Sequence, residues 1–258
     1  MSVMLTEDVG AVRVLTLNRP AARNALSGEL ISALYRALLD ADGDAGVRAI
    51  VLTGADPAFC AGVDLKQAAS EGAAYFRRFE EENCIGQAAL VRTPIIGAVN
   101  GAAFTGGLEL ALGCDFLVAS DRAVFADTHV RVGVLPGGGL TARLPQLVGP
   151  AQARRMSMTG ELVDAARAER LGLVTEVVPH DGLRGRALEL AGAIAEVPAP
   201  AMAGLKRIYT ESAGSLLGPA LEIETRIARA HDSDLGGLEE RRVAVLHRNR
   251  AQFNEEKG

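Results

Sequence analysis

Apolar residues in the first part of the chain follow first a strand pattern and then a helix pattern. Val12 to Leu17 alternates apolar and polar residues, as a half-buried strand does, and Pro20 follows shortly after it. Ser27 then precedes apolar residues at helical spacing, which predicts a helix with a serine N-cap. The apolar positions of this predicted helix are Leu30, Ile31, Leu34, Leu38 and Leu39.

Three continuous apolar runs follow, at 49–53, 95–99 and 116–119, and each predicts a strand that is buried on both faces. Helical patterns separate them, one from about Lys66 to Val91 and one from about Gly106 to Leu112. Strands that alternate with helices at this spacing favour parallel pairing through right-handed crossovers. The fold class is therefore α/β.

Beyond Pro150 the pattern changes, and helical periodicity dominates to residue 253. We expect interruptions by a strand-like run at 174–179 and by breaks at 198–200 and 214–219. The last predicted helix, 238–253, is charged on one side, so it packs either on its own domain or between subunits. No apolar run approaches the roughly 20 residues that span a bilayer, and the chain starts without a basic leader. We therefore expect no membrane association and a cytoplasmic location.

Composition and charge narrow the class of ligand. The 258 residues are 48% hydrophobic, which is typical of one compact domain with at most a small appendage. A net charge of -5 argues against a nucleic-acid partner, although a local basic patch is compatible with a phosphorylated small ligand. Cys60, Cys84 and Cys114 lack CxxC spacing, so we expect no disulfide framework and no metal site.

The segment 95–115 combines a strand with an unusual helix start. A buried strand ends in an Asn-Gly pair, and after a loop Gly106-Gly107 opens a helix with Glu109 in its first turn. Backbone N–H groups at a helix start have no intrahelical partner and can hold an anionic oxygen. Glu109 follows Gly106 by three residues and lies on the same helix face. This places a carboxylate beside an oxyanion donor, although acidic residues are also common in first turns because of the helix dipole.

Four motifs in order resemble the crotonase superfamily, the enoyl-CoA hydratase/isomerase family. They are LNRPAARNALS at 17–27, FCAGVDL at 59–65, AVNGAAFTGGLELALGCD at 98–115 and GVLPGGGLTARLPQLVG at 133–149. The resemblance implies a crotonase-like spiral of ββα units over residues 1–195. It also implies a helical C-terminal trimerisation region over 196–258 and a homo-oligomer, either a trimer or a dimer of trimers.

The resemblance also implies roles for particular residues. The backbone N–H groups of Ala61 and Gly106 would form an oxyanion hole around a thioester carbonyl, with Glu109 as the first catalytic glutamate. No bound cofactor is implied, because coenzyme A enters as part of an acyl-CoA substrate. Arg23 and Lys66 are candidate phosphate partners, or equally ordinary solvated cations. The implied coenzyme A contacts are Arg23, Ala25, Ala61, Gly62, Val63, Asp64, Leu65 and Lys66.

The chain departs from the family pattern at one catalytic position. Family hydratases carry a second glutamate twenty residues after the first, and His129 occupies that position here. Histidine titrates near neutrality and can act as acid or base, so it can replace the carboxylate or merely line the pocket. Asp127, on the same side if the segment is extended, is either a substitute acid/base or an orienting group.

These residues lead to three hypotheses about function. The first is an enoyl-CoA hydratase of fatty-acid or other acyl-CoA metabolism, which adds water to 2-enoyl-CoA through Glu109 and His129. The second is a Δ3–Δ2 enoyl-CoA isomerase that needs Glu109 alone. The third is an acyl-CoA-binding protein that has lost catalysis together with the second glutamate.

Overall fold

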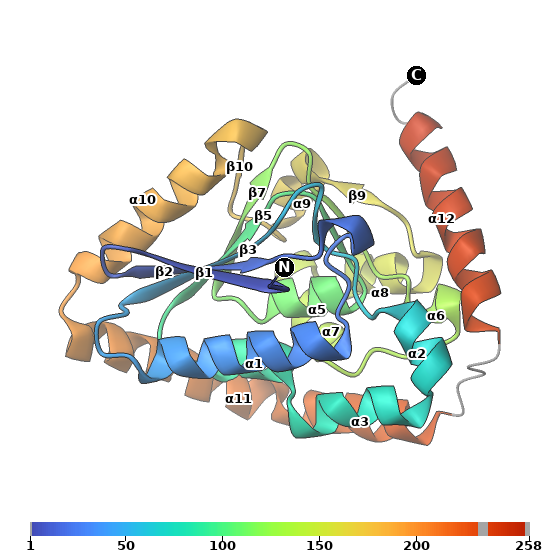
Figure 1. The fold of residues 1–258 in the computed structure, drawn as a ribbon, viewed down its shortest axis with the longest axis horizontal. Helices are drawn as coiled ribbons and strands as arrows, with labels where there is room; N and C mark the ends of the chain where they lie inside the picture. Colours follow the sequence, from blue (N-terminus) through green and yellow to red (C-terminus); the bar gives the residue numbers. More distant parts are fainter. Residues whose placement is uncertain (1, 232–236, 256–258) are drawn as a thin grey trace.

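A six-stranded sheet lies at the centre of the computed structural model, which describes residues 2–231 and 237–255 (Figure 1). Neighbouring strands are parallel except for the first, which pairs antiparallel with the second. The predicted parallel strands are confirmed, whereas the first strand was missed because all but one of its residues are exposed and no apolar pattern marks it. In spatial order the strands are β1 (Met4–Val9), β2 (Val12–Leu17), β3 (Ala49–Gly54), β5 (Ile95–Val99), β7 (Phe116–Ser120) and β10 (Glu176–Val178).

A second, smaller sheet follows from three repeats of one unit. Strands β3, β5 and β7 each lead into a short strand and then a helix, which confirms the spiral of ββα units. The short strands pair in parallel with one another, and a fourth strand closes the sheet antiparallel. These strands are β4 (Ala58–Cys60), β6 (Ala102–Phe104), β8 (Val124–Ala126) and β9 (Val163–Asp164), and the three helices are α2 (Leu65–Glu71), α5 (Gly106–Leu112) and α6 (His129–Val132).

Both faces of the large sheet are buried, which explains its continuous apolar strands. Helix α10 (Leu183–Glu196) covers one face through Leu183, Ala187 and Ala191. Alternate residues such as Leu15 and Leu52 point to the other face, where they join the main core with α1 (Gly28–Gly43) and α5. The residues toward α10 are Val12, Val14, Ala49, Val51, Ile96, Ala98 and Val118.

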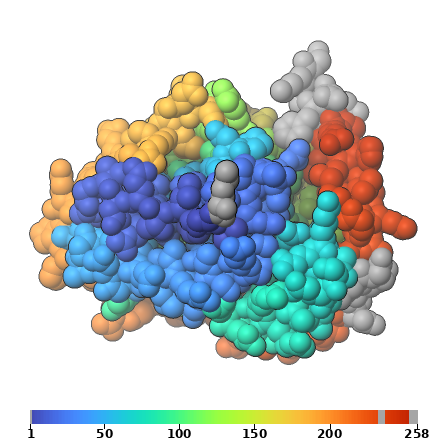
Figure 2. Space-filling view, viewed as in Figure 1, coloured from blue at the N-terminus to red at the C-terminus, as the bar shows by residue number. Residues whose placement is uncertain are grey.

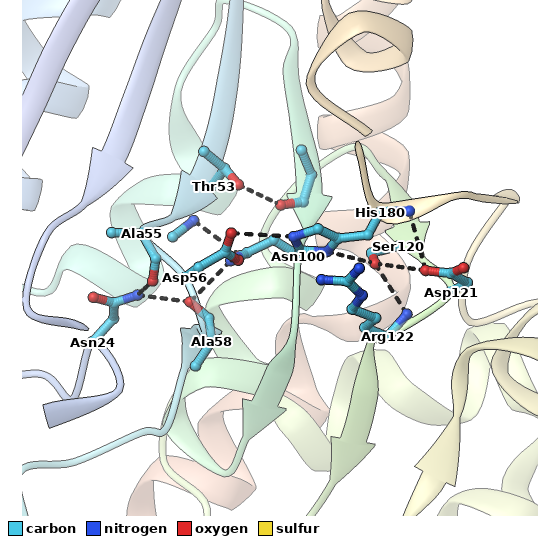
Figure 3. Close-up of polar contacts among 12 residues, drawn as sticks. Asn24, Thr53, Ala55, Asp56, Ala58, Asn100, Ser120, Asp121, Arg122 and His180 are labelled. Atoms are coloured by element: carbon cyan, nitrogen blue, oxygen red, sulfur yellow. Dashed lines mark hydrogen bonds and ion pairs between the residues drawn. The ribbon is translucent and has the colours of Figure 1, made fainter. Parts of the chain in front are cut away.

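Polar side chains hold the corner where the chain passes from the large sheet to the small one (Figure 3). Asn100, after β5, accepts from Gly54 N (3.3 Å) and donates to Asp56 Oδ1 (2.8 Å). His180, in the 3-10 turn η2 (His180–Gly182), bridges Asp56 Oδ2 (3.1 Å) and the Ser120 hydroxyl (3.0 Å). These bonds satisfy backbone and side-chain groups from successive turns of the spiral, and so they fix how the turns stack.

The predicted helix from Lys66 to Val91 is wrong in its continuity. The structure has three helices there, α2, α3 (Ala73–Glu81) and α4 (Cys84–Leu90). Gly72 separates the first two with φ +57°, a conformation that favours glycine. Asn83 begins the third by accepting from Gly86 N (2.8 Å). An isolated glycine is tolerated inside a helical pattern, so the sequence pattern did not show the break at Gly72.

In the C-terminal third, the predicted strand over 174–179 is confirmed as β10, and the predicted break at 198–200 separates α10 from α11 (Ala199–Ala230). The predicted break at 214–219 is wrong, because α11 continues through Pro219. The carbonyl that lacks its helical donor belongs to Ser215, which is exposed, so water can bond it. The remaining elements are η1 (Pro20–Ala22), α7 (Leu140–Val148), α8 (Pro150–Thr159), α9 (Ala165–Leu171) and α12 (Leu238–Glu255).

Helix α12 packs on its own chain, against α2 and α6. Figure 2 shows it in red beside the teal surface of the 65–90 segment. These contacts are the packing on its own domain that the charge pattern allows. Within 2–231 and 237–255 no single helix is long and apolar enough to cross a membrane, though 180–196 and 199–230, bent by 110°, pass that test as a pair.

Candidate active site

The small sheet brings distant segments of the chain to one place. In its register Cys60 pairs with Ala103, and Phe104 pairs with Ala126. The segments that follow β4, β6 and β8 therefore begin side by side, although more than forty residues separate the first from the second. Each segment carries a predicted functional residue: Ala61 follows β4, Gly106 follows β6 and His129 follows β8. The spiral thus assembles a candidate site at the ends of the short strands.

A pocket of about 950 Å³ opens at this place. His129 lines it, together with most of the predicted coenzyme A contacts. Among the described residues, Gly62 and Glu109 do not line the pocket: Gly62 is buried in the same loop, and Glu109 is 3% exposed and contacts the lining residue His129. The structure therefore gathers the predicted residues around one cavity. The predicted contacts that line it are Arg23, Ala25, Ala61, Val63, Asp64, Leu65 and Lys66.

Four further arginines line this pocket, and the sequence analysis missed them. Arg19 pairs with Asp64 (3.0 Å), and Arg242 pairs with Glu239 (2.6 Å). The four come from separate segments of the chain, including α12, so no local motif marks them as a group. They make the pocket more basic than Arg23 and Lys66 alone, against the net negative charge of the chain. They are Arg19, Arg122, Arg242 and Arg250.

The structure corrects the first of the two predicted oxyanion donors. The N–H of Ala61 donates to the Arg23 carbonyl oxygen at 3.0 Å, so it is already engaged. Two residues later, Val63 forms a parallel bridge with Leu26. In that bridge the Leu26 N–H donates to the Gly62 carbonyl oxygen (2.8 Å), and the Asp64 N–H donates to the Leu26 carbonyl oxygen (3.4 Å). The N–H of Val63 therefore points away from Leu26, and within the described ranges it has no acceptor.

Gly106, the second predicted donor, is the first residue of α5, where the N–H has no acceptor inside the helix. Thr105 precedes it with φ +50°, a strained conformation for a residue with a side chain. Gly62 lies so close that a Cβ built on it would be 3.1 Å from Gly106 N. The loops of Val63 and Gly106 are therefore in contact, and Val63 takes the place of Ala61 in the candidate donor pair.

The Glu109 carboxylate is held by one backbone donor and faces one side chain. Its Oε1 accepts from Gly138 N at 2.7 Å, and its Oε2 lies 3.7 Å from His129 Nε2. Burial raises the pKa of Glu109 above its usual value. The His129 charge opposes that increase, whereas the negative charges of Glu224 and Asp127 add to it. A carboxyl group with a raised pKa exchanges protons more readily near neutrality.

Asp127 and His129 form a local turn, so the extended segment that would have placed them on the same side is not present. His129 begins α6, and Asp127 Oδ1 accepts both its backbone N–H (3.1 Å) and its Nδ1 (2.7 Å). Burial acts to raise the pKa of Asp127, but the hydrogen bond and charge of His129 outweigh it and hold that pKa below its usual range. Asp127 is therefore placed to orient the imidazole, the second of its two predicted roles.

The His129 ring is held by Asp127 at Nδ1 and faces Glu109 with Nε2. Burial acts to lower the pKa of His129, but the charges of Glu109 and Asp127 outweigh it and raise that pKa above its usual value. With Nδ1 committed to Asp127, the exchangeable position is Nε2, which faces Glu109. The site thus contains two adjacent acid/base groups of different chemistry.

Comparison with known proteins settles the family. The family model described as enoyl-CoA hydratase/isomerase matches residues 7–240. The chain belongs to the enoyl-CoA hydratase/isomerase family.

Several relatives of this chain are named as enoyl-CoA hydratases. A probable enoyl-CoA hydratase of Mycobacterium tuberculosis is 39% identical over 224 residues, which are 87% of each chain. A probable enoyl-CoA hydratase of Rhizobium meliloti is 41% identical over 226 residues, again 87% of each chain. Similarity thus extends over almost the whole chain.

Solved structures of the family superpose on the described fold. The enoyl-CoA hydratase of Mycobacterium tuberculosis is 45% identical with a TM-score of 0.81, over 89% of this chain and 98% of that one. A monofunctional enoyl-CoA isomerase of Mycobacterium smegmatis is 32% identical with a TM-score of 0.71, over 83% and 94%. These comparisons confirm the family and the crotonase fold. The structures compared include one named as a hydratase and one named as an isomerase.

The role of Asp127 is testable by titration of His129. Because the Asp127 charge stabilises the imidazolium, Asp127→Asn should lower the pKa of His129, and the midpoint should move to lower pH. Ring-carbon NMR of the histidines in labelled protein measures that midpoint. Asp40→Asn, at an exposed position of α1, is the matched control and should leave it unchanged. If the His129 titration midpoint were the same in Asp127→Asn and Asp40→Asn, that result would contradict the orienting role of Asp127.

Proposed function

We propose that this member of the family is an enoyl-CoA hydratase, which adds water across the double bond of a 2-enoyl-CoA thioester. The observation that carries the proposal is the contact of Glu109 Oε2 with His129 Nε2 at 3.7 Å. Hydration needs one group to deprotonate water and another to protonate carbon. The buried pair supplies both, with imidazole in place of the second carboxylate.

The gap between the two groups suits a single water molecule. Water about 2.8 Å from both atoms can bridge them, since each distance is then an ordinary hydrogen bond. As the water oxygen bonds to the β-carbon, the Glu109 carboxylate takes its proton. The electron pair of the double bond moves onto the thioester oxygen. The N–H groups of Val63 and Gly106 would stabilise that enolate, and each such donor is typically worth about 10² to 10³ in rate.

Protonation of the α-carbon completes the reaction. The His129 imidazolium gives its Nε2 proton to the α-carbon, and the enolate electrons form the new C–H bond. Glu109 then returns its proton to His129, which lies directly opposite. The net change is the addition of one water molecule, and both groups recover their starting states. No bound cofactor takes part in this route.

The pocket supports the assignment of an acyl-CoA substrate. Coenzyme A carries phosphates, and Arg23, Lys66, Arg19 and Arg122 line the same cavity as His129. Arginine and lysine are the usual partners of phosphate groups. We place the enzyme in fatty-acid or other acyl-CoA metabolism, in the cytoplasm.

Isomerisation from Δ3 to Δ2 is the second candidate, because the structural relatives include a monofunctional isomerase at 32% identity. A 1,3-proton shift needs one group that removes and returns a proton, and Glu109 alone is sufficient for it. The two reactions therefore differ in their need for His129.

Substitutions at the two groups separate these candidates. Glu109→Gln should lower kcat for 2-enoyl-CoA hydration by about 10² to 10⁴, because it removes the base. His129→Ala should lower hydration by a similar factor, whereas His129→Glu should retain more activity because a second acid/base group is restored. The assay follows loss of the conjugated thioester absorbance, with the mass of the product as a check for added water.

Each other outcome points to a different function. Conversion of a 3-enoyl-CoA without a gain of mass, unaffected by His129→Ala, would favour the isomerase. Tight acyl-CoA binding without turnover of either thioester would favour the non-catalytic protein. Full hydration activity in Glu109→Gln would contradict the proposed mechanism.

We also propose that the chain forms a homo-oligomer, a trimer or a dimer of trimers, through its helical region at 196–258. Helix α11 exposes a series of large apolar side chains, with Leu216 77% exposed. An exposed apolar face on one helix is typical of a protein interface. A second copy of the chain is the occupant that the family resemblance implies. The exposed residues are Leu205, Ile208, Tyr209, Leu216, Ile223 and Ile227.

Sedimentation tests this interface. The wild-type protein should sediment as a trimer or hexamer, and Leu216→Glu combined with Ile223→Glu should shift it toward monomer, because two charges would be buried at the contact. Val9→Glu places a charge on an exposed apolar residue of β1 and should not change the mass. A monomeric wild type would exclude the oligomer.

A further inference from the structure

Glu224 is a buried carboxylate that the proposed reaction does not use. Glu224 belongs to α11, which is far from the site in sequence. Only 7% of Glu224 is exposed. Its Oε1 accepts from Gly139 N at 2.5 Å, and its Oε2 accepts from Thr141 N at 2.7 Å and from the Thr141 hydroxyl. A buried carboxylate with this many donors is held firmly in one orientation.

These bonds cap the start of another helix. Gly139 is the N-cap of α7, with φ +99°, and as glycine it has no side chain to bond the free N–H groups of the first turn. Glu224 supplies the missing acceptor from α11. Its negative charge also lies at the positive end of the α7 dipole. The turn that begins α7 therefore depends on a residue of a different helix.

The peptide next to this cap holds the catalytic glutamate. Gly138 N donates to Glu109 Oε1 at 2.7 Å, and the following N–H, of Gly139, donates to Glu224. On the other side of the same turn, Arg143 donates to the Gly138 carbonyl at 2.6 Å. Gly138 also packs tightly against the carboxylate, because a Cβ built on it would lie 2.7 Å from Glu109 Oε2. Small movements of the turn would thus move Glu109.

We propose that Glu224 is a positioning residue, which fixes the 138–141 turn so that Gly138 N–H holds Glu109 toward His129. This inference rests on the proposed hydratase function and extends it to α11. In the part of the chain that the structure describes, the hydrogen bonds of Glu224 go to Gly139 and Thr141 and to neither Glu109 nor His129. Its effect on the reaction is therefore indirect, through the backbone of the turn.

Charges around Glu109 support the same connection. The charged groups that act on it are His129 from α6, Asp127 just after β8, Arg143 from α7 and Glu224 from α11. Negative charge on Glu224 adds to the increase that burial causes in the pKa of Glu109. The carboxylate of α11 therefore acts on Glu109 in two ways, through the turn and through its charge.

Glu224→Gln tests the proposal, because glutamine keeps the size of the side chain but only one of its two acceptor oxygens. Glu222→Gln is the matched control, since it removes an exposed carboxylate from the same helix. We expect Glu224→Gln to lower kcat for hydration roughly tenfold to a hundredfold with KM changed far less, because the base is misplaced while the pocket is intact. Glu222→Gln should match the wild type.

Two further readouts separate positioning from general loss of structure. Hydrogen exchange of a peptide that covers 137–142 should be faster in Glu224→Gln than in Glu222→Gln, with thermal unfolding showing that both are folded. Glu224→Asp, which keeps the charge but is one methylene shorter, should also lower kcat. If Glu224→Gln does not fold, Thr141→Val, which removes only the hydroxyl donor, should show a smaller change in the same directions.

Faster exchange with unchanged kcat would overturn the proposal, because the turn would then be structural only. Equal exchange in the two glutamine variants would overturn it as well, since the cap would not hold the turn. If the wild type shows no hydration, the proposed function fails, and the exchange measurement still decides whether Glu224 fixes the turn that bonds Glu109.

Discussion

Parallel pairing of the three short strands β4, β6 and β8 is the constraint on which the site depends. Each strand follows a strand of the large sheet, so the register of the small sheet sets where the next backbone segment begins. That register places the loop of Val63 against the start of α5 and α5 beside the turn of His129. A change in pairing by one residue would reverse which side chains point into the pocket.

Burial of Glu109 has a cost that its surroundings offset. A carboxylate out of water is unfavourable unless donors or opposite charges face it. Gly138 N–H and the His129 ring provide both, and Asp127 in turn orients the ring. The two raised pKa values have different causes: burial raises the pKa of Glu109 despite the His129 charge, and the charges of Glu109 and Asp127 raise the pKa of His129 despite its burial. The contacts that stabilise the buried Glu109 carboxylate are therefore also the contacts that bring the two acid/base groups together.

Much of the fold was predictable, and the failures have physical reasons. Except for the exposed β1, the strands of the large sheet and helix α5 have apolar patterns, and Ser27 and Gly106 mark helix starts. The short strands are too brief to show periodicity. In the site, local motifs located Glu109, Gly106 and His129, but the Ala61 assignment failed because only the fold shows which N–H is already bonded. Glu224 has no local signal, since its partners are far away in the sequence.

The central claim is that Glu109 and His129 act as one acid/base pair, and a double-mutant cycle tests it most directly. The measured quantity is kcat for hydration of a 2-enoyl-CoA in the wild type, Glu109→Gln, His129→Ala and the double variant. Groups that work as a unit are not additive, so the double variant should be about as slow as the slower single variant. Losses that multiply would contradict the account, because the two groups would then act independently.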